Sequence, residues 1–156
     1  MDFRITGLAP ELFKAFFQMD DAALAARGAL RIFADDTSPG FPCRVSLAHA
    51  AHGEELVLLA FEHQPAHSPY RAVGPIFARK SATAAFDAVN IVPEPVRVRL
   101  LSVRAYDAAH MIVEADVVDG CKLEDLIHRY FLRADVVYLH VHYARRGCYA
   151  CRVDRV

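Results

Sequence analysis

The sequence has no apolar run long enough to cross a membrane and no excess of basic charge. Its longest apolar run, Leu56–Phe61, is far shorter than the ~20 residues that a membrane-spanning helix needs. The formal net charge of −1 argues against a nucleic-acid-binding protein, because such proteins carry a basic face or tail. The first residues, MDFRITG, contain no basic region followed by an apolar stretch, so we expect no signal peptide. We therefore expect a cytoplasmic protein that binds neither membranes nor nucleic acids.

Cysteine is also scarce, and no repeat or low-complexity segment divides the chain. Four cysteines among 156 residues are too few to support a disulfide-built domain, and we expect them to be reduced thiols. Hydrophobic residues make up 54% of the chain, which is ample for a core. We therefore predict one domain that spans residues 1–156.

The order of periodic segments predicts an α+β fold. Pro10 followed by apolar residues at helical spacing, and Asp20 or Asp21 before an Ala-rich stretch that Gly28 ends, predict N-terminal helices. An apolar stripe at helical spacing predicts a late amphipathic helix over 123–133. Seven segments have strand-like patterns: Leu30–Ala34, Arg44–Leu47, Leu56–Phe61, Ile76–Arg79, Val96–Arg104, Met111–Val118 and Val136–Tyr143. We expect a mostly antiparallel sheet of five to seven strands, with the N-terminal helices and the late helix packed on it.

Two further local structures are expected in the middle of the chain. Ser81 can cap a short Ala-rich helix that ends near Val89. The strands on either side of Tyr106–Ala109 predict a hairpin, which would place Arg99 opposite Glu114. Such a cross-strand pair is structural and marks no site.

The C-terminal part of the chain predicts a β-hairpin with histidine on its polar face. Along Val136–Tyr143, alternation places Tyr138, His140 and His142 on one face. The following residues, Arg145–Gly147, predict a three-residue loop, because Gly supplies the left-handed conformation that such loops require.

This loop length predicts which residues of the two strands face one another. It pairs His142 with Ala150 and His140 with Arg152, and it places Cys148 on the histidine face. A two- or four-residue loop would mix polar and apolar side chains on one face, so we favour three residues.

The C-x-x-C pair is then split between the two faces of the hairpin. In a strand, a separation of three sends Cys148 and Cys151 to opposite sides, with Tyr149 joining Cys151 on the apolar side. Redox and zinc sites need a turn or a helix start that brings the two sulfurs together. We therefore interpret Cys151 as a small buried apolar residue.

Cys148 and His142 are the candidate catalytic pair. Side chains can close the diagonal separation between them on one face. Arg145 and Arg146 would lower the pKa of the thiol, and the thiolate is the reactive nucleophile. The alternative is that both residues are structural.

His140 and His142 also have the spacing of a metal-binding His-x-His pair on a strand. A metal would need at least one more ligand, from a set that the sequence does not separate: His63, His67, Glu62 or Cys148. The alternative is two half-exposed histidines on a sheet face. We therefore assign no metal and no cofactor.

A proline-punctuated loop over 63–75 provides candidate ligand-binding residues. Arg71 could hold a carboxylate or phosphate through two parallel hydrogen bonds, with Tyr70 and His63 assisting. Arg44, in the turn G-F-P-C-R, could serve the same anion. The alternative is a surface loop that Tyr70 anchors on the core.

Several long motifs resemble those of one protein family. They are G-F-P-C-R-V-S-L, E-H-Q-P-A-H-S-P-Y-R-A-V-G-P-I-F, R-A-Y-D and H-V-H-Y-A-R-R-G-C-Y-A-C-R-V-D-R. Together they resemble an uncharacterised family of small bacterial proteins, number twelve-oh-three in the domain-of-unknown-function series, over nearly the whole chain. The resemblance implies a bacterial single-domain protein and no activity. The family pattern has Asn more often than Tyr at the position of Tyr143, and this departure alters the end of the hairpin.

The leading hypothesis is a pocket for a small anionic molecule, as a binding protein or an enzyme, where the proline-punctuated loop meets the histidine face. Its ligand-binding residues would be His63, Tyr70, Arg71, Arg44 and His140. An alternative is a protein-interaction or regulatory module without catalysis. A weaker alternative is a metal-dependent enzyme that uses the His-x-His strand. A homo-oligomer is compatible with each.

Overall fold

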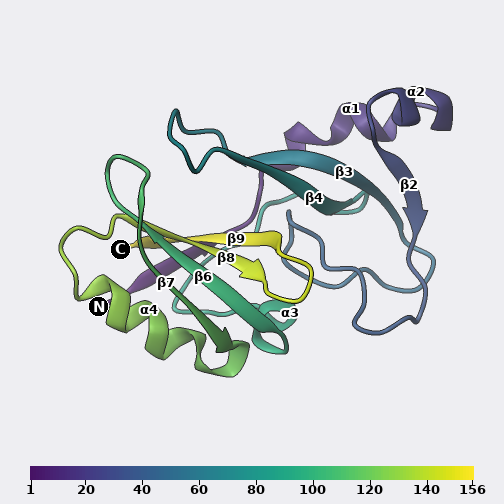
Figure 1. Cartoon of the computed structure of the whole chain (residues 1–156). Coiled ribbons are helices and arrows are strands. Elements are labelled where there is room, and N and C mark those ends of the chain that lie inside the picture. The colour runs from purple at the N-terminus through teal and green to yellow at the C-terminus, as the bar shows by residue number, and fades with distance from the viewer.

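The computed structural model describes residues 1–156 and contains two antiparallel sheets (Figure 1). The larger sheet has six strands in the order β5-β1-β9-β8-β6-β7, and the smaller has three in the order β2-β3-β4. The strands are β1 Phe3–Thr6, β2 Leu30–Phe33, β3 Glu55–Gln64, β4 Ala72–Arg79, β5 Asp87–Val89, β6 Leu100–Tyr106, β7 Ile112–Asp119, β8 Tyr138–Tyr143 and β9 Cys148–Arg155. The helices are η1 Pro10–Leu12, α1 Lys14–Phe17, α2 Asp21–Ala26, α3 Glu94–Arg97, η2 Gly120–Lys122 and α4 Leu123–Phe131.

The mixed α/β class and the antiparallel sheet are confirmed, while the separate three-stranded sheet was not expected. None of the helices is both long enough and apolar enough to span a membrane.

Helix α4 covers one face of the six-stranded sheet, as Figure 1 shows. Its apolar stripe is entirely buried in the main core: Leu123, Leu126, Ile127, Tyr130 and Phe131. Acidic residues in the first turn and basic residues in the last turn match the helix dipole. The predicted late amphipathic helix is confirmed, and it leaves the opposite face of the sheet for the three-stranded sheet (Figure 1).

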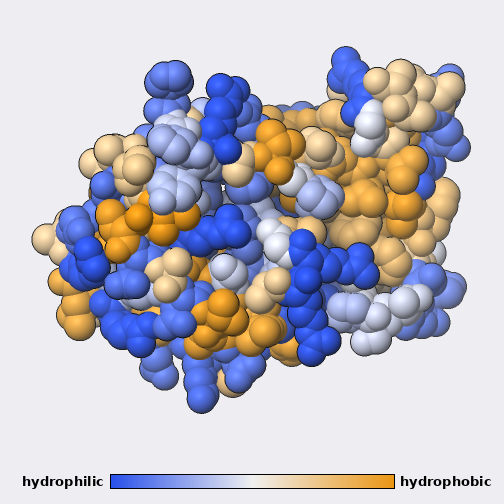
Figure 2. Space-filling view, in the orientation of Figure 1, coloured by the Kyte–Doolittle hydropathy of each residue, from blue (hydrophilic) through white to orange (hydrophobic).

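The N-terminal helices are short and pack beside the three-stranded sheet. The Asp20 side chain caps α2 by accepting a hydrogen bond of 2.8 Å from the Ala23 N–H, and Gly28 follows the helix with a positive φ of 65°. Leu24 joins a second, smaller core with residues of β3 and β4. Figure 2 shows apolar side chains gathered over this end of the molecule.

Two expected elements between Arg44 and Val89 are wrong. The Arg44–Leu47 segment forms no strand, and only isolated bridges at Pro42 and Cys43 precede it. The chain turns at Leu47, which has a positive φ of 48°. The helix after Ser81 does not form, since the Ser81 hydroxyl donates to Glu54 instead of capping. The backbone of Phe86 bonds to other segments in an extended course, and strand β5 follows.

The expected register of the central hairpin is also wrong. The chain forms α3 before β6, and Arg97 there pairs with Glu124 at 2.8 Å. The strand begins later than predicted, so Glu114 lies opposite Ala105 rather than Arg99. The Arg99 guanidinium instead lies over the Tyr143 ring, 5.0 Å from its centroid.

The C-terminal hairpin differs from its prediction by one residue in the turn. Tyr143 pairs with Cys148, so the turn comprises the four residues Ala144–Gly147. Gly147 has the positive φ of 75° that was expected of it. The extra residue moves Tyr149, not Ala150, opposite His142.

A β-bulge at Ala150 then restores the predicted pairing further along the strand. The register shifts between the pairs made by Val141 and His142, so His140 lies opposite Arg152 as expected. A bulge inserts one residue and reverses which face the following side chains occupy relative to a regular strand. The turn length and the bulge together determine which side chains of β9 lie on the same face as His140 and His142.

Candidate functional site

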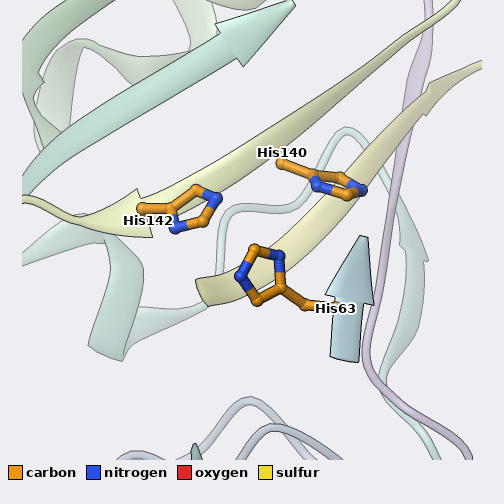
Figure 3. Close-up of side chains that lie close together, drawn as sticks. All are labelled: His63, His140 and His142. Atoms are coloured by element: carbon orange, nitrogen blue, oxygen red, sulfur yellow. The ribbon is translucent and has the colours of Figure 1, made fainter. Parts of the chain in front are cut away.

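Three histidines from two sheets converge between those sheets, and we call them the histidine cluster: His63, His140 and His142 (Figure 3). His140 and His142 lie two apart on β8 and therefore share a face. His63 comes from the end of β3, where the pairing with β4 is irregular. One ring nitrogen from each histidine lies within 4.8 Å of the others.

Burial keeps the histidine cluster neutral. His140 and His142 are 3% and 1% exposed, and burial lowers the pKa of each to about 3. Burial also lowers the pKa of the half-buried His63. Neutral imidazole is the form that binds metal ions, so protons do not compete for these nitrogens at pH 7.

Each histidine of the cluster has a buried nitrogen without a hydrogen-bond partner. These atoms are Nδ1 of His63, Nδ1 of His140 and Nε2 of His142. An unpaired buried polar group costs about 1–3 kcal/mol, and most buried polar groups in proteins are paired. Three such atoms in one cluster are therefore an unusual concentration of unpaired buried nitrogens.

A backbone contact sets the tautomer of His142. Its Nδ1 lies 3.0 Å from the carbonyl oxygen of Gly147, which can only accept, so Nδ1 carries the proton and donates it. The lone pair is then on Nε2, the atom without a partner. Metal-binding histidines are commonly oriented in this way, by donating the other ring N–H to a carbonyl.

Tyr149 holds the three imidazole rings from one side. Its ring stacks on His63 at a centroid distance of 5.2 Å and an interplanar angle of 8°. It meets the rings of His140 and His142 edge-on, at 5.1 and 5.8 Å. These contacts restrict how far each ring can turn away from the cluster.

Two more tyrosines support His140 from the other side. Tyr106 and Tyr138 stack on one another at 5.0 Å, and their rings lie 5.0 and 5.2 Å from that of His140. Gln64 donates to the Tyr138 hydroxyl at 2.8 Å, and Nδ1 of His110 lies 2.9 Å from the same oxygen. This network links the two sheets next to the cluster.

Two arginines flank His140 in the sheet, one on each neighbouring strand. Arg152 lies opposite it on β9 and pairs with Asp154 at 2.7 Å. Arg104 lies opposite it on β6 and takes part in none of the ion pairs of the structure. The positive charge of Arg104 contributes, after burial, to the lowered pKa of each histidine in the cluster.

The histidine cluster fits a transition metal of the kind that prefers imidazole. Zn–N bonds of about 2.0–2.1 Å in tetrahedral geometry place the donor nitrogens about 3.3 Å apart. The ring nitrogens lie within 4.8 Å of one another, so coordination would require the rings to move closer together wherever a separation exceeds that value. Three protein ligands leave a fourth position open, as in catalytic zinc sites.

The other expected ligand-binding residues do not join the cluster. The Arg71 guanidinium is exposed and pairs with Glu62. Tyr70 is 38% exposed, and its ring reaches only Tyr106, edge-on at 6.5 Å. The loop predicted over 63–75 is shorter in the structure, because His63 belongs to β3.

Arg44 is buried, and its guanidinium donates hydrogen bonds to backbone carbonyls. It is 2% exposed, its Nε donates to the carbonyl of Tyr149 at 2.6 Å, and another nitrogen donates to the carbonyl of Pro42. Its guanidinium also lies 4.9 Å from the centroid of the Tyr143 ring. These contacts stabilise the start of β9 and leave the guanidinium away from solvent.

The structure separates Cys148 from His142. Directly opposed residues share a face, and Cys148 lies opposite Tyr143, one position beyond His142 on β8. The bulge also places Cys148 and Cys151 on the same face, contrary to the predicted split, since Cys151 lies opposite Val141. Burial raises the pKa of Cys151 to about 12, so it remains a thiol.

Sequence reasoning missed Tyr149 and Arg104 as neighbours of the cluster. The four-residue turn alone places Tyr149 opposite His142, and the bulge at Ala150 returns the following residues to the predicted pairing; no residue type in the sequence predicts that bulge. Arg104 stands at a polar position of β6, and only the pairing of β6 with β8 shows that it faces His140.

Comparisons with known proteins identify the family and no function. Neither the curated proteins nor the solved structures contain a significant match. Residues 40–155 match the family described as "Protein of unknown function (DUF1203)", and this range includes the whole histidine cluster. The family suggested by the sequence motifs is thus confirmed, and the chain belongs to the DUF1203 family.

Proposed function

We propose that the chain is a metal-binding protein in which the histidine cluster coordinates one divalent transition-metal ion. The observation that carries this proposal is the convergence of three imidazole rings: one ring nitrogen from each lies within 4.8 Å of the others, and each ring has a buried nitrogen without a hydrogen-bond partner. We also propose that residues 1–156 form one domain, because the cluster takes ligands from both sheets.

The ligand set favours zinc or a neighbouring first-row metal. Imidazole suits Zn, Cu, Fe and Ni, whereas Ca²⁺ and Mg²⁺ prefer oxygen ligands. With three neutral ligands the full +2 charge remains on the ion, which would lower the pKa of a water in the open position to about 7. The site would therefore suit hydrolysis or hydration, by generating hydroxide or by polarising a carbonyl or phosphoryl oxygen.

A purely structural role is the alternative for these three residues. They would then form a neutral polar cluster that packs between the sheets, with buried water bonding to the three nitrogens. This alternative requires no affinity for a metal beyond that of any surface histidine, which makes metal binding the decisive measurement.

The test is a Co²⁺ and Zn²⁺ titration of the full chain after chelator treatment. We expect one ion per chain, and a tetrahedral Co²⁺ absorption spectrum. His63→Ala and His140→Gln should each weaken binding by at least about 10-fold, since even partners of metal ligands contribute that much. The control is His52→Ala, because His52 is exposed and contacts only Asp36 among charged groups.

Circular dichroism and melting curves check that each variant is folded. The proposal is refuted if the folded wild-type chain binds no stoichiometric Co²⁺ or Zn²⁺. It is equally refuted if the two cluster variants bind as tightly as His52→Ala.

A further inference from the structure

Arg104 on β6 is a half-buried arginine without an acidic partner. It lies directly opposite His140 in the pairing of β6 with β8, so the two side chains project from the same face of the sheet. Opposed Cβ atoms lie about 4.5–5.5 Å apart, and an arginine side chain is long enough to reach beyond its neighbour. The guanidinium of Arg104 therefore projects beside the histidine cluster.

Other arginines close to the cluster or named as anion-binding candidates already have partners. Arg152 pairs with Asp154, Arg71 pairs with Glu62, and Arg44 donates to backbone carbonyls. Arg104 has no such carboxylate. It is thus the arginine beside the cluster that has neither a carboxylate nor a backbone carbonyl as a partner.

The cluster itself contains no acidic group. Its potential metal ligands are histidines only, so a bound divalent ion would keep its full charge next to the positive charge of Arg104. Like charges in a largely buried region repel strongly, because the effective dielectric constant is low. A negatively charged ligand that contacts both the ion and Arg104 would remove this repulsion.

We propose that the open position of the metal centre takes an oxyanion, a carboxylate or a phosphate group, held between the metal ion and the Arg104 guanidinium. This inference rests on the proposed metal site and names the class of its substrate or ligand. The planar fork of arginine donates two parallel hydrogen bonds to such groups. Ser102, opposite His142 on the same face, adds a hydroxyl next to this position.

A consequence of this arrangement is that metal and anion bind cooperatively. Each partner neutralises part of the repulsion that the other meets, and coupling between two sites is reciprocal. Couplings of this kind typically change affinity by roughly 5–150-fold. We expect an oxyanion to tighten Co²⁺ binding by about 10-fold, and to change the visible spectrum of the bound Co²⁺.

The experiment measures Co²⁺ affinity by competition with a chromogenic chelator, with and without inorganic phosphate or acetate. Chloride at equal ionic strength is the control, and the two anions show whether phosphate or carboxylate is preferred. Arg104→Met should reduce the anion effect to less than about twofold, and Arg104→Lys should retain part of it, since lysine keeps the charge without the fork. The control is Arg129→Met, an exposed residue on α4 that pairs with Asp116.

The outcomes separate the two proposals. If Co²⁺ does not bind to the folded wild-type chain, the proposed metal site and the present inference are both refuted. If Co²⁺ binds but neither anion changes its affinity or spectrum, only the present inference is overturned. The same holds if Arg104→Met keeps the full anion effect. Because the wild-type measurement alone can refute the inference, a poorly folded variant does not leave it undecided.

Discussion

The metal-free protein should lose stability when the pH is lowered from 7 to 5, and two buried histidines set the size of the loss. Burial lowers the pKa of His140 and His142 to about 3 in the folded protein, whereas the unfolded value is about 6.5. Protons therefore bind preferentially to the unfolded chain. The stability that these histidines contribute is fully present above pH ~6.5 and is lost as the pH falls toward the folded pKa.

The expected magnitude follows from the linkage between proton binding and unfolding. At pH 5 each imidazole is protonated in the unfolded chain and neutral in the folded protein. Protonation therefore shifts the equilibrium toward the unfolded chain by a factor of about 30 for each histidine, which corresponds to about 2 kcal/mol. The two together cost about 4 kcal/mol, a large part of the ~5–15 kcal/mol by which domains are usually stable. Paired carboxylates such as Glu124 and Asp116, whose pKa values are lowered by hydrogen bonds from arginine, contribute to loss of stability only at lower pH.

The cations around the two histidines act in the same direction. Arg104 on β6 and Arg152 on β9 both disfavour an additional positive charge on His140. His63 on β3 also lowers the pKa of both residues. No acidic group is among the causes of either shift.

The assay is urea unfolding of the chelator-treated protein at pH 7, 6 and 5, followed by circular dichroism. We expect the free energy of unfolding to fall with pH, and we expect His140→Gln to remove about half of that fall, because glutamine does not titrate. The control His52→Ala should retain the wild-type fall. The reasoning is refuted if the wild-type free energy is the same at pH 7 and 5, or if His140→Gln keeps the full pH dependence.

Three further predictions concern the metal and the fold. Zn²⁺ at 100 times its Kd should stabilise the wild-type chain by about 2.7 kcal/mol, and calorimetric melting of His63→Ala should show no such gain. Gly120→Ala should destabilise the fold by about 2 kcal/mol in urea unfolding, because a Cβ there would lie 2.1 Å from the carbonyl oxygen of Val96; an unchanged midpoint would contradict this. Asp20→Ala should cost about 1 kcal/mol through loss of the α2 cap, and Co²⁺ titration should show unaltered metal binding, since the cap is remote from the cluster.

The local sequence was sufficient to predict the features that depend only on residues close together in the chain. Alternation along β8 placed His140 and His142 on one face, because the side-chain period of a strand is two. The stripe of α4 and the cap at Asp20 were likewise local. The family was apparent from long motifs, and the match over residues 40–155 bears this out.

The predicted helix and strand boundaries were wrong where contacts between distant segments outweigh the local conformational preference. Arg44 lies in a segment with a strand-like pattern, yet it is buried with its guanidinium bonded to the carbonyl of Tyr149, far along the chain. Arg97 lies in a short helix and pairs with Glu124 on a later element. Neither partner can be deduced from spacing, because a contact between remote segments leaves no period in the sequence.

The histidine cluster shows most clearly what the sequence determined and what the tertiary structure determined. The sequence by itself determined that His140 and His142 project together, and it left the third residue open among several candidates. Only the tertiary structure selected His63, because the end of β3 packs against β8 from a separate sheet. It also placed Tyr149 beside the histidines and moved Cys148 away from them. The physical reason is that one additional residue in a turn, or one bulge, reverses the face of every side chain that follows in a strand.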